Sequence, residues 1–183
     1  MAHLHKHCAY PKRSMTYRNP ITRDARPDLT VASIVVRDDR FLVVEEEVRG
    51  RRVFNQPAGH VDVGESLIDA AIRETREETG WLIRPTAWTG AYQWSVLDDD
   101  SPERHDDEYG GREFLRFVFI GDALEHDAVQ PLDDGIIAAH WLSLSEIEAL
   151  GERLRSPLVL AAVRDFLDGP QLPLSALRNL QGL

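Results

Sequence analysis

Three glutamates, Glu74, Glu77 and Glu78, are spaced so that a helix would bring them onto one face. At 3.6 residues per turn they span an arc of about 100°, and like charges this close repel one another unless a cation lies among them. A fourth acid, Glu65, precedes them in a glycine-containing loop. Clustered carboxylates suit Mg²⁺ or Mn²⁺, and these ions serve phosphate chemistry. A solvated acidic face is the alternative, because most charged side chains are exposed.

The segment that carries these acids has the signals of a helix with defined ends. Ser66 predicts an N-cap, with Asp69 as the capping-box acid, and Gly80 predicts the left-handed residue that follows the last turn. We expect Thr75 to bond back to the Ala71 carbonyl. The three glutamates are centred about 130° from the apolar stripe, so we expect them to face away from the core. A mostly apolar stripe comprises Ile68, Ala71, Ile72, Thr75 and Thr79.

The full spacing resembles the signature motif of the Nudix hydrolase family. The residues that match are Gly59, Glu65, Arg73-Glu74, Glu77-Glu78 and Gly80 followed by an apolar residue. Thr75 departs from the family, which usually has an aliphatic residue there. The resemblance spans roughly Leu29 to Leu174. Further segments resemble one phosphatase branch of the family: Phe54-Asn55-Gln56-Pro57-Ala58-Gly59-His60, Tyr92-Gln93-Trp94, Phe114-Leu115-Arg116-Phe117, His140-Trp141 and Leu154-Arg155-Ser156-Pro157-Leu158-Val159.

The resemblance implies an α/β fold, an α/β/α sandwich with a mixed β-sheet. It also implies that Glu74, Glu77 and Glu78 hold the metal, and that Arg73 pairs with an acid such as Glu65 to brace loop and helix. We group Arg73 with the catalytic residues, and we assign Glu65 and Gly80 structural roles.

The Gly59 carbonyl is a further candidate metal ligand, because a glycine lets the backbone approach an ion closely. Glu77 or Glu78 is expected to take the proton of the attacking water. Many family members add an acid from a distant loop, but Gly135 and Ile136 stand where that acid is common. The candidates here are Asp98-Asp100, Asp106-Glu108, Glu113 and Asp133-Asp134.

Four residues are candidates for binding the substrate: Arg116, Gln56, Trp94 and Gln93. Arg116 on an inner strand face needs an anionic partner such as phosphate, although an ion pair with Glu45 or Glu47 would also satisfy it. Trp94 can stack on a ring, with core packing as the alternative. The two glutamines offer neutral hydrogen bonds.

Composition limits the class of protein. The chain has 183 residues, 43% of them hydrophobic, enough for one domain with a core. Its net charge of −10 argues against nucleic-acid and anionic-membrane partners. An anionic substrate stays compatible, because bound divalent cations reverse the local charge. The single cysteine, Cys8, and the lack of a signal-peptide or transmembrane pattern indicate the cytoplasm.

The pattern of apolar runs predicts one catalytic domain at 29–168, between a flexible tail at 1–28 and a C-terminal tail at 169–183. Asp38-Asp39 between two β-branched runs predicts a hairpin. Ser143 or Ser145 is expected to cap one helix, and Ser156-Pro157 to open another. We expect strands at 29–36, 41–48, 53–54, 81–83, 88–94, 113–120 and 138–142, and later helices at 146–150 and 157–167.

The expected activity is Mg²⁺-dependent hydrolysis of phosphoanhydrides by a monomer or homodimer. The family branch implies release of phosphate from nucleoside di- and triphosphates and from thiamine-type pyrophosphates. Cleavage of ADP-ribose or of a nucleotide sugar is one alternative. A non-catalytic binding module is another, although such modules usually lose the acids that this chain retains.

Overall fold

Strand β1 (Asp28–Arg37) is the centre of a mixed sheet in the computed structural model, which describes residues 26–96 and 112–180. It runs parallel to β6 (Arg112–His126) and antiparallel to β4 (Ala58–His60). At its end it joins β2 (Arg40–Val48) through a hairpin in which Val36 pairs with Phe41. Most of the expected N-terminal tail, residues 1–25, lies outside the described residues. The predicted mixed sheet is confirmed.

The β1–β2 turn confirms the hairpin that was predicted between the two β-branched runs. Asp38 and Asp39 have φ of 53° and 57°. Two successive left-handed residues make the turn whose twist matches that of paired strands, and aspartate tolerates this conformation better than most residues.

Strands β3 (Arg51–Asn55) and β7 (Ile136–Leu142) flank β2, and β5 (Trp81–Val96) pairs with β6 along its length. The prediction of two strands at 81–83 and 88–94 was wrong, because one strand runs through both. The register of this strand against β6 shifts between Pro85 and Ala87 and between Trp88 and Gly90, close to the gap between the two predicted strands.

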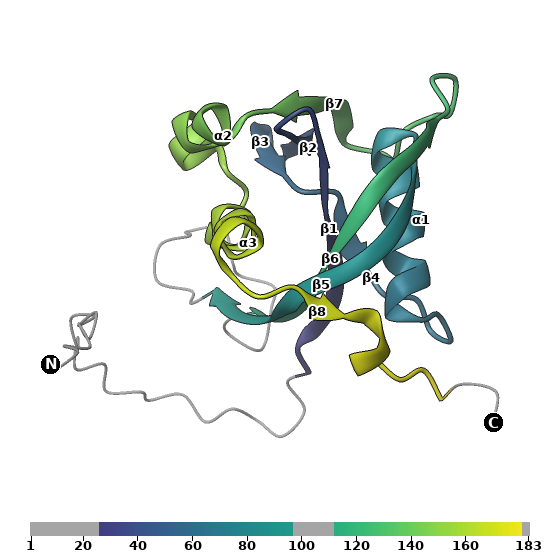
Figure 1. Cartoon of the computed structure of the whole chain (residues 1–183). Coiled ribbons are helices and arrows are strands. Elements are labelled where there is room, and N and C mark those ends of the chain that lie inside the picture. The colour runs from purple at the N-terminus through teal and green to yellow at the C-terminus, as the bar shows by residue number, and fades with distance from the viewer. Residues whose placement is uncertain (1–25, 97–111, 181–183) are drawn as a thin grey trace, which may run out of the picture.

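Helices cover both faces of the sheet, which confirms the α/β/α sandwich (Figure 1). Helix α1 (Leu67–Thr79) packs Ala70 and Ala71 against Val31 and Phe119. On the opposite face lie α2 (Leu144–Leu150), the short helix η1 (Gly151–Arg153) and α3 (Pro157–Asp168). Here Val159 and Val163 pack against residues of β1 and β6.

The segment that was expected to be a C-terminal tail contains two short elements, the second of which ends at Ala176. It contains β8 (Leu172–Pro173), which pairs with β5, and η2 (Leu174–Ala176). The Trp88 indole N–H donates to the Pro173 carbonyl at 3.2 Å, and Leu174 and Leu177 pack on the α1 side of the core. The run is too short to show a periodic pattern, so these tertiary contacts could not be read from the sequence.

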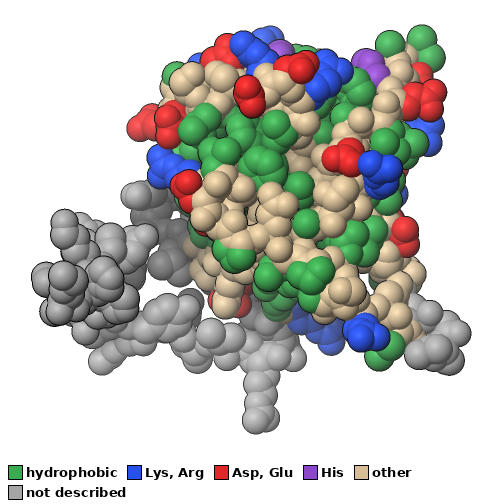
Figure 2. Space-filling model, viewed as in Figure 1, with side chains coloured by type: hydrophobic (Ala, Val, Ile, Leu, Met, Phe, Trp, Pro, Cys, Tyr) green, Lys and Arg blue, Asp and Glu red, His purple; other side chains and the backbone are tan. Residues whose placement is uncertain are grey.

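Figure 2 shows acidic and basic side chains scattered over one face of the protein, with apolar side chains between them.

None of the helices formed by residues 26–96 and 112–180 combines the length and the apolar composition needed to cross a membrane.

Candidate active site

Helix α1 begins and ends where its cap residues predict. The Ser66 hydroxyl accepts the Asp69 N–H at 3.0 Å, and Gly80 adopts φ of 71° while donating its N–H to the Arg76 carbonyl. The Thr75 hydroxyl donates to the Ala71 carbonyl at 2.7 Å, as expected. These local bonds fix where the helix begins and ends, and the packing of Ala70 and Ala71 on the sheet sets which way its acids point.

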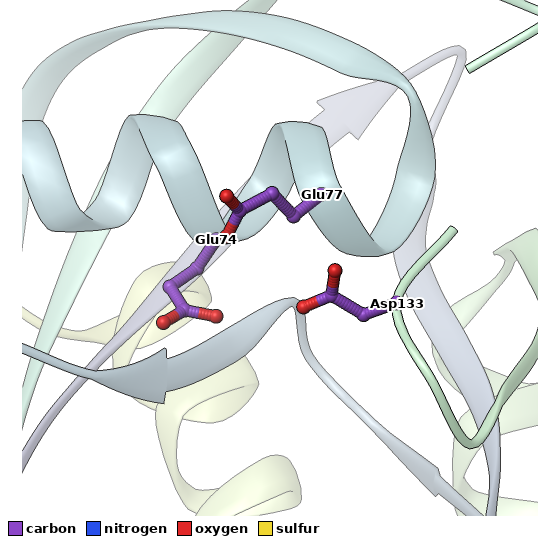
Figure 3. Close-up of side chains that lie close together, drawn as sticks. All are labelled: Glu74, Glu77 and Asp133. Atoms are coloured by element: carbon purple, nitrogen blue, oxygen red, sulfur yellow. The ribbon is translucent and has the colours of Figure 1, made fainter. Parts of the chain in front are cut away.

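Three carboxylates gather at the C-terminal half of α1. Oxygens of Glu74, Glu77 and Asp133 all lie within 4.8 Å of one another (Figure 3). Asp133 comes from the segment before β7, and its N–H donates to the Glu77 carbonyl at 3.1 Å. This backbone bond ties the loop to the end of the helix and holds the third acid in place.

Gly59 in β4 lies directly against the Glu74 carboxylate. A Cβ atom at this position would overlap the carboxylate oxygens of Glu74. Gly59 pairs with Val31 in the sheet, so its backbone is fixed and cannot easily retreat. Any larger residue at this position would therefore displace the Glu74 carboxylate, whereas glycine lets the main chain come this close to it.

The expectation that all three glutamates face away from the core was wrong for two of them. Glu74 and Glu78 are only 8% and 9% exposed. Segment 58–60 covers their side of α1, and the Ala58 N–H donates to Glu78 Oε2 at 2.8 Å. Burial raises the pKa of Glu74 above its ordinary value and raises that of Glu78 to about 8. Glu78, which was predicted to be a metal ligand with the other two glutamates, is buried and is not part of the group formed by Glu74, Glu77 and Asp133.

Arg73 joins the loop to the helix by a fork of hydrogen bonds. Its Nε and Nη2 donate to the two oxygens of Glu65, both at 2.9 Å, and Nη2 also reaches the His60 carbonyl. Its Nη1 donates to Glu74 at 2.7 Å and to Glu77 at 2.9 Å. The hydrogen bond from Arg73 holds the pKa of Glu65 below its ordinary value. The guanidinium thus binds the loop acid and offsets the repulsion between the helix acids.

Replacing Arg73 with alanine should lower both thermal stability and activity. Hydrogen bonds to charged groups contribute about 1.5–3 kcal/mol, which for a chain of this size corresponds to a fall in Tm of about 3–12 °C. Differential scanning fluorimetry and initial rates measure the two effects. The matched control is Arg76→Ala on the exposed side of α1, where the side chain bonds Gln130. A loss of rate at unchanged Tm would instead mean that Arg73 acts directly on the substrate.

The four candidate substrate residues fall into different environments. Arg116 and Gln56 are buried, at 9% and 2% exposure. Trp94 stacks on Phe114 with ring centroids 5.5 Å apart. Gln93 is exposed, and as the neighbour of Trp94 in β5 it points to the opposite face of the sheet. The structure therefore groups Trp94 with Arg116 and separates Gln93 from both.

The alternative partners proposed for Arg116 are also corrected. Glu45 bonds His140 at 3.0 Å and lies 3.5 Å from Arg52, and Glu47 is exposed. The acids that act electrostatically on Arg116 are Glu78 and Glu46. Burial, as the larger effect, lowers its pKa to about 10.

Asp133 is the distant acid that the structure brings to the helix. Of the other candidates, Glu113 accepts a hydrogen bond from Ser95 in the β5–β6 ladder. The candidates at 98–100 and 106–108 lie outside the described residues. The only sequence signal for Asp133 was its place in an acidic pair before Gly135, which also fits an ordinary surface turn.

Comparisons with known proteins agree on one family. A model of the NUDIX domain matches residues 27–162. Phosphatase NudJ of Escherichia coli (strain K12) is 38% identical over 149 residues, which cover 81% of this chain and 89% of NudJ. A solved NUDIX hydrolase from Nitrosomonas europaea superposes with a TM-score of 0.78 at 38% identity, covering 86% of this chain and 100% of that one. A more distant structure, an ADP-ribose pyrophosphatase from Streptococcus suis, shares the fold at a TM-score of 0.55 and 19% identity, over 80% of this chain and 96% of its own.

Proposed function

This chain belongs to the Nudix hydrolase family, and we propose that it is a Mg²⁺-dependent phosphatase of the NudJ type. The substrates proposed are nucleoside di- and triphosphates and thiamine-type pyrophosphates, from which it would release orthophosphate. The resemblance seen in the motif and in the flanking segments is confirmed by these comparisons. The family and the NudJ likeness make the protein a hydrolase that acts on pyrophosphate bonds.

The observation that carries the proposal is the group formed by Glu74, Glu77 and Asp133 beside Gly59. Three carboxylates whose oxygens lie within 4.8 Å of one another form the hard, anionic donor set that Mg²⁺ prefers. We propose that these residues hold the ion, with the Gly59 carbonyl as a further ligand. When bound, the ion would neutralise the phosphate oxygens and acidify a water molecule.

The protein side chains supply the remaining functions. Glu77 is half-exposed at the edge of the group, so it can reach a solvent water as the base. Glu78 is buried behind it and keeps the Ala58 amide in place. Arg73 holds Glu74 and Glu77 in position through its Nη1. Catalysis of this kind depends mainly on such positioning and on electrostatic stabilisation.

A panel of substrates tests the proposal directly. With millimolar Mg²⁺, we expect this protein to release orthophosphate from GDP, GTP and thiamine pyrophosphate when no phosphomonoesterase is added. ADP-ribose and a nucleotide sugar should give no direct orthophosphate. A malachite-green assay with and without an added phosphomonoesterase measures both cases.

The other outcomes select the alternatives. Phosphate that appears only after the monoesterase is added would mean cleavage into two organic monophosphates, as in a nucleotide-sugar pyrophosphatase. No phosphate under either condition would favour a binding module. Loss of release on addition of EDTA, restored by excess Mg²⁺, is expected only for the metal-dependent hydrolase.

A further inference from the structure

Of the three grouped acids, Asp133 alone lies outside α1. Like charges this close repel one another until a cation binds, and no helix keeps Asp133 in its place. Figure 3 shows its side chain next to Glu74 and Glu77 but on a separate segment of the chain. Contacts made by that segment must therefore hold Asp133 against the helix acids.

The segment at 127–133, which we call the strap, lies along the C-terminal end of α1. Backbone hydrogen bonds join both of its ends to this part of the chain. The Asp127 N–H donates to the Gly80 carbonyl at 2.9 Å, and the Asp133 N–H donates to the Glu77 carbonyl at 3.1 Å. The last carbonyls of a helix have no partner within it, so they are open to donors of this kind.

Gln130 joins the middle of the strap to α1 through its side chain. Its Nε2 donates to the Arg76 carbonyl at 2.9 Å, and its Oε1 accepts a hydrogen bond from Arg76 Nε at 2.9 Å. The nitrogen and the oxygen of the amide therefore both bind the same residue of the helix. Gln130 also lines the same hollow of the surface as Arg73 and Glu77, so it lies close to the group of acids.

The rest of the strap is held weakly by apolar packing. Ala128 and Pro131 are exposed, and Val129 is 89% exposed, so these three side chains face the solvent. Gln130 and Leu132 are partly buried. Between its two ends, the strap therefore depends on the amide of Gln130 for its polar contact with α1.

The chain that follows Asp133 is fixed to the sheet instead of the helix. The Ile136 N–H donates to the Asp133 carbonyl at 3.0 Å, and the Gly135 carbonyl accepts the Glu47 N–H of β2 at 2.8 Å. These bonds set where β7 begins. The distance of Asp133 from the helix acids is then set by how closely the strap before it follows α1.

We propose that Gln130 is a positioning residue for the metal site, because it clasps the strap to α1 and so places the Asp133 carboxylate beside Glu74 and Glu77. The assignment rests on the proposed function, in which these three acids hold Mg²⁺. Gln130 acts through the backbone that carries Asp133 and not through the ion or the substrate. A ligand that is already in place binds an ion more tightly, because less of the chain has to be ordered on binding.

Metal binding without any substrate tests this role apart from hydrolysis. In a calorimetric titration of the full chain with Mn²⁺, Gln130→Ala should bind roughly 3–10-fold more weakly than the wild type, as expected for a lost hydrogen bond. Groups that bond a metal ligand directly have larger effects, about 10–100-fold. In rate measurements the variant should need more Mg²⁺ for half-maximal rate and should keep its kcat at saturating Mg²⁺.

Hydrogen exchange in the metal-free protein, measured by NMR, tests the strap itself. The Asp133 amide should exchange roughly 3–10-fold faster in Gln130→Ala, because the strap opens more often, whereas the Thr75 amide inside α1 should keep its rate. Gln171→Ala, an exposed glutamine outside the strap, is the matched control and should change neither rate. Arg76→Ala should have a smaller effect than Gln130→Ala, because it keeps the carbonyl that Gln130 binds.

Three other outcomes are decisive. Unchanged Mn²⁺ affinity and unchanged Asp133 exchange in Gln130→Ala would overturn the positioning role and leave the proposed function, even if the Tm falls. Faster exchange with unchanged Mn²⁺ affinity would also overturn it, because Asp133 would then not be a ligand that has to be placed. A wild type that binds no Mn²⁺ would remove the metal-dependent function, and the positioning role with it.

Discussion

Replacing Glu77 with glutamine should lower kcat by about 10²–10⁴-fold, because a bound divalent ion contributes several kcal/mol to stabilising the charge of the transition state. Glu77 is one of the three grouped acids, and at 38% side-chain exposure it is more exposed than Glu74, the other member of the group on α1. The variant should also need more Mg²⁺ for half-maximal rate. Initial rates across a Mg²⁺ titration measure both changes.

The fold should survive this substitution. The Arg73–Glu77 pair is partly exposed, and such pairs contribute about 0–1 kcal/mol. Removing one acid also relieves repulsion in the metal-free group. Glu148→Gln is the matched control. Glu148 lies on α2 and, like Glu77, its carboxylate accepts a hydrogen bond from an arginine, in this case Arg164. Turnover near the wild-type value in Glu77→Gln would show that Glu77 is not a metal ligand.

Helix α1 could be predicted closely from sequence because the signals that define it are local. Ser66 and Gly80 act on backbone groups within one turn, and the Thr75–Ala71 bond spans four residues. The β1–β2 hairpin was predicted for the same reason, since Asp38 and Asp39 set the turn themselves. Local rules do not depend on which element packs against the segment.

The remaining parts of the site depend on tertiary contacts. A helical wheel gives the direction of Glu74 and Glu78, but only the placement of segment 58–60 makes that direction a buried one. Asp133 is brought to the acids by a backbone bond to Glu77 from a loop far along the chain. Arg116 lies on the same face of β6 as Val118, which packs against α3, so its environment depends on where that helix lies. No spacing rule within the sequence predicts these three results.

Burial of Glu78 makes the stability of the metal-free protein depend on pH. Its pKa is about 8 in the folded protein against an ordinary value of 4.5, so the folded state binds this proton more tightly than the unfolded state. The stabilisation is complete below about pH 4.5 and is lost as the pH rises towards 8. A shift of this size corresponds to an effect on the order of 5 kcal/mol. Glu74 has a raised pKa for the same reason and adds to the trend.

Glu78→Gln should therefore flatten the pH dependence of stability in EDTA. The glutamine Oε1 can still accept the Ala58 N–H, but it has no proton to lose between pH 5 and pH 8. Urea unfolding at pH 5, 6, 7 and 8 should show a large fall in midpoint for the wild type and a much smaller one for the variant. Adding Mg²⁺ at pH 8 should restore the wild-type midpoint, because an ion that binds only the folded state stabilises it. An equally steep fall in Glu78→Gln would mean that the pH dependence arises from other buried groups, such as Glu74, and not from Glu78.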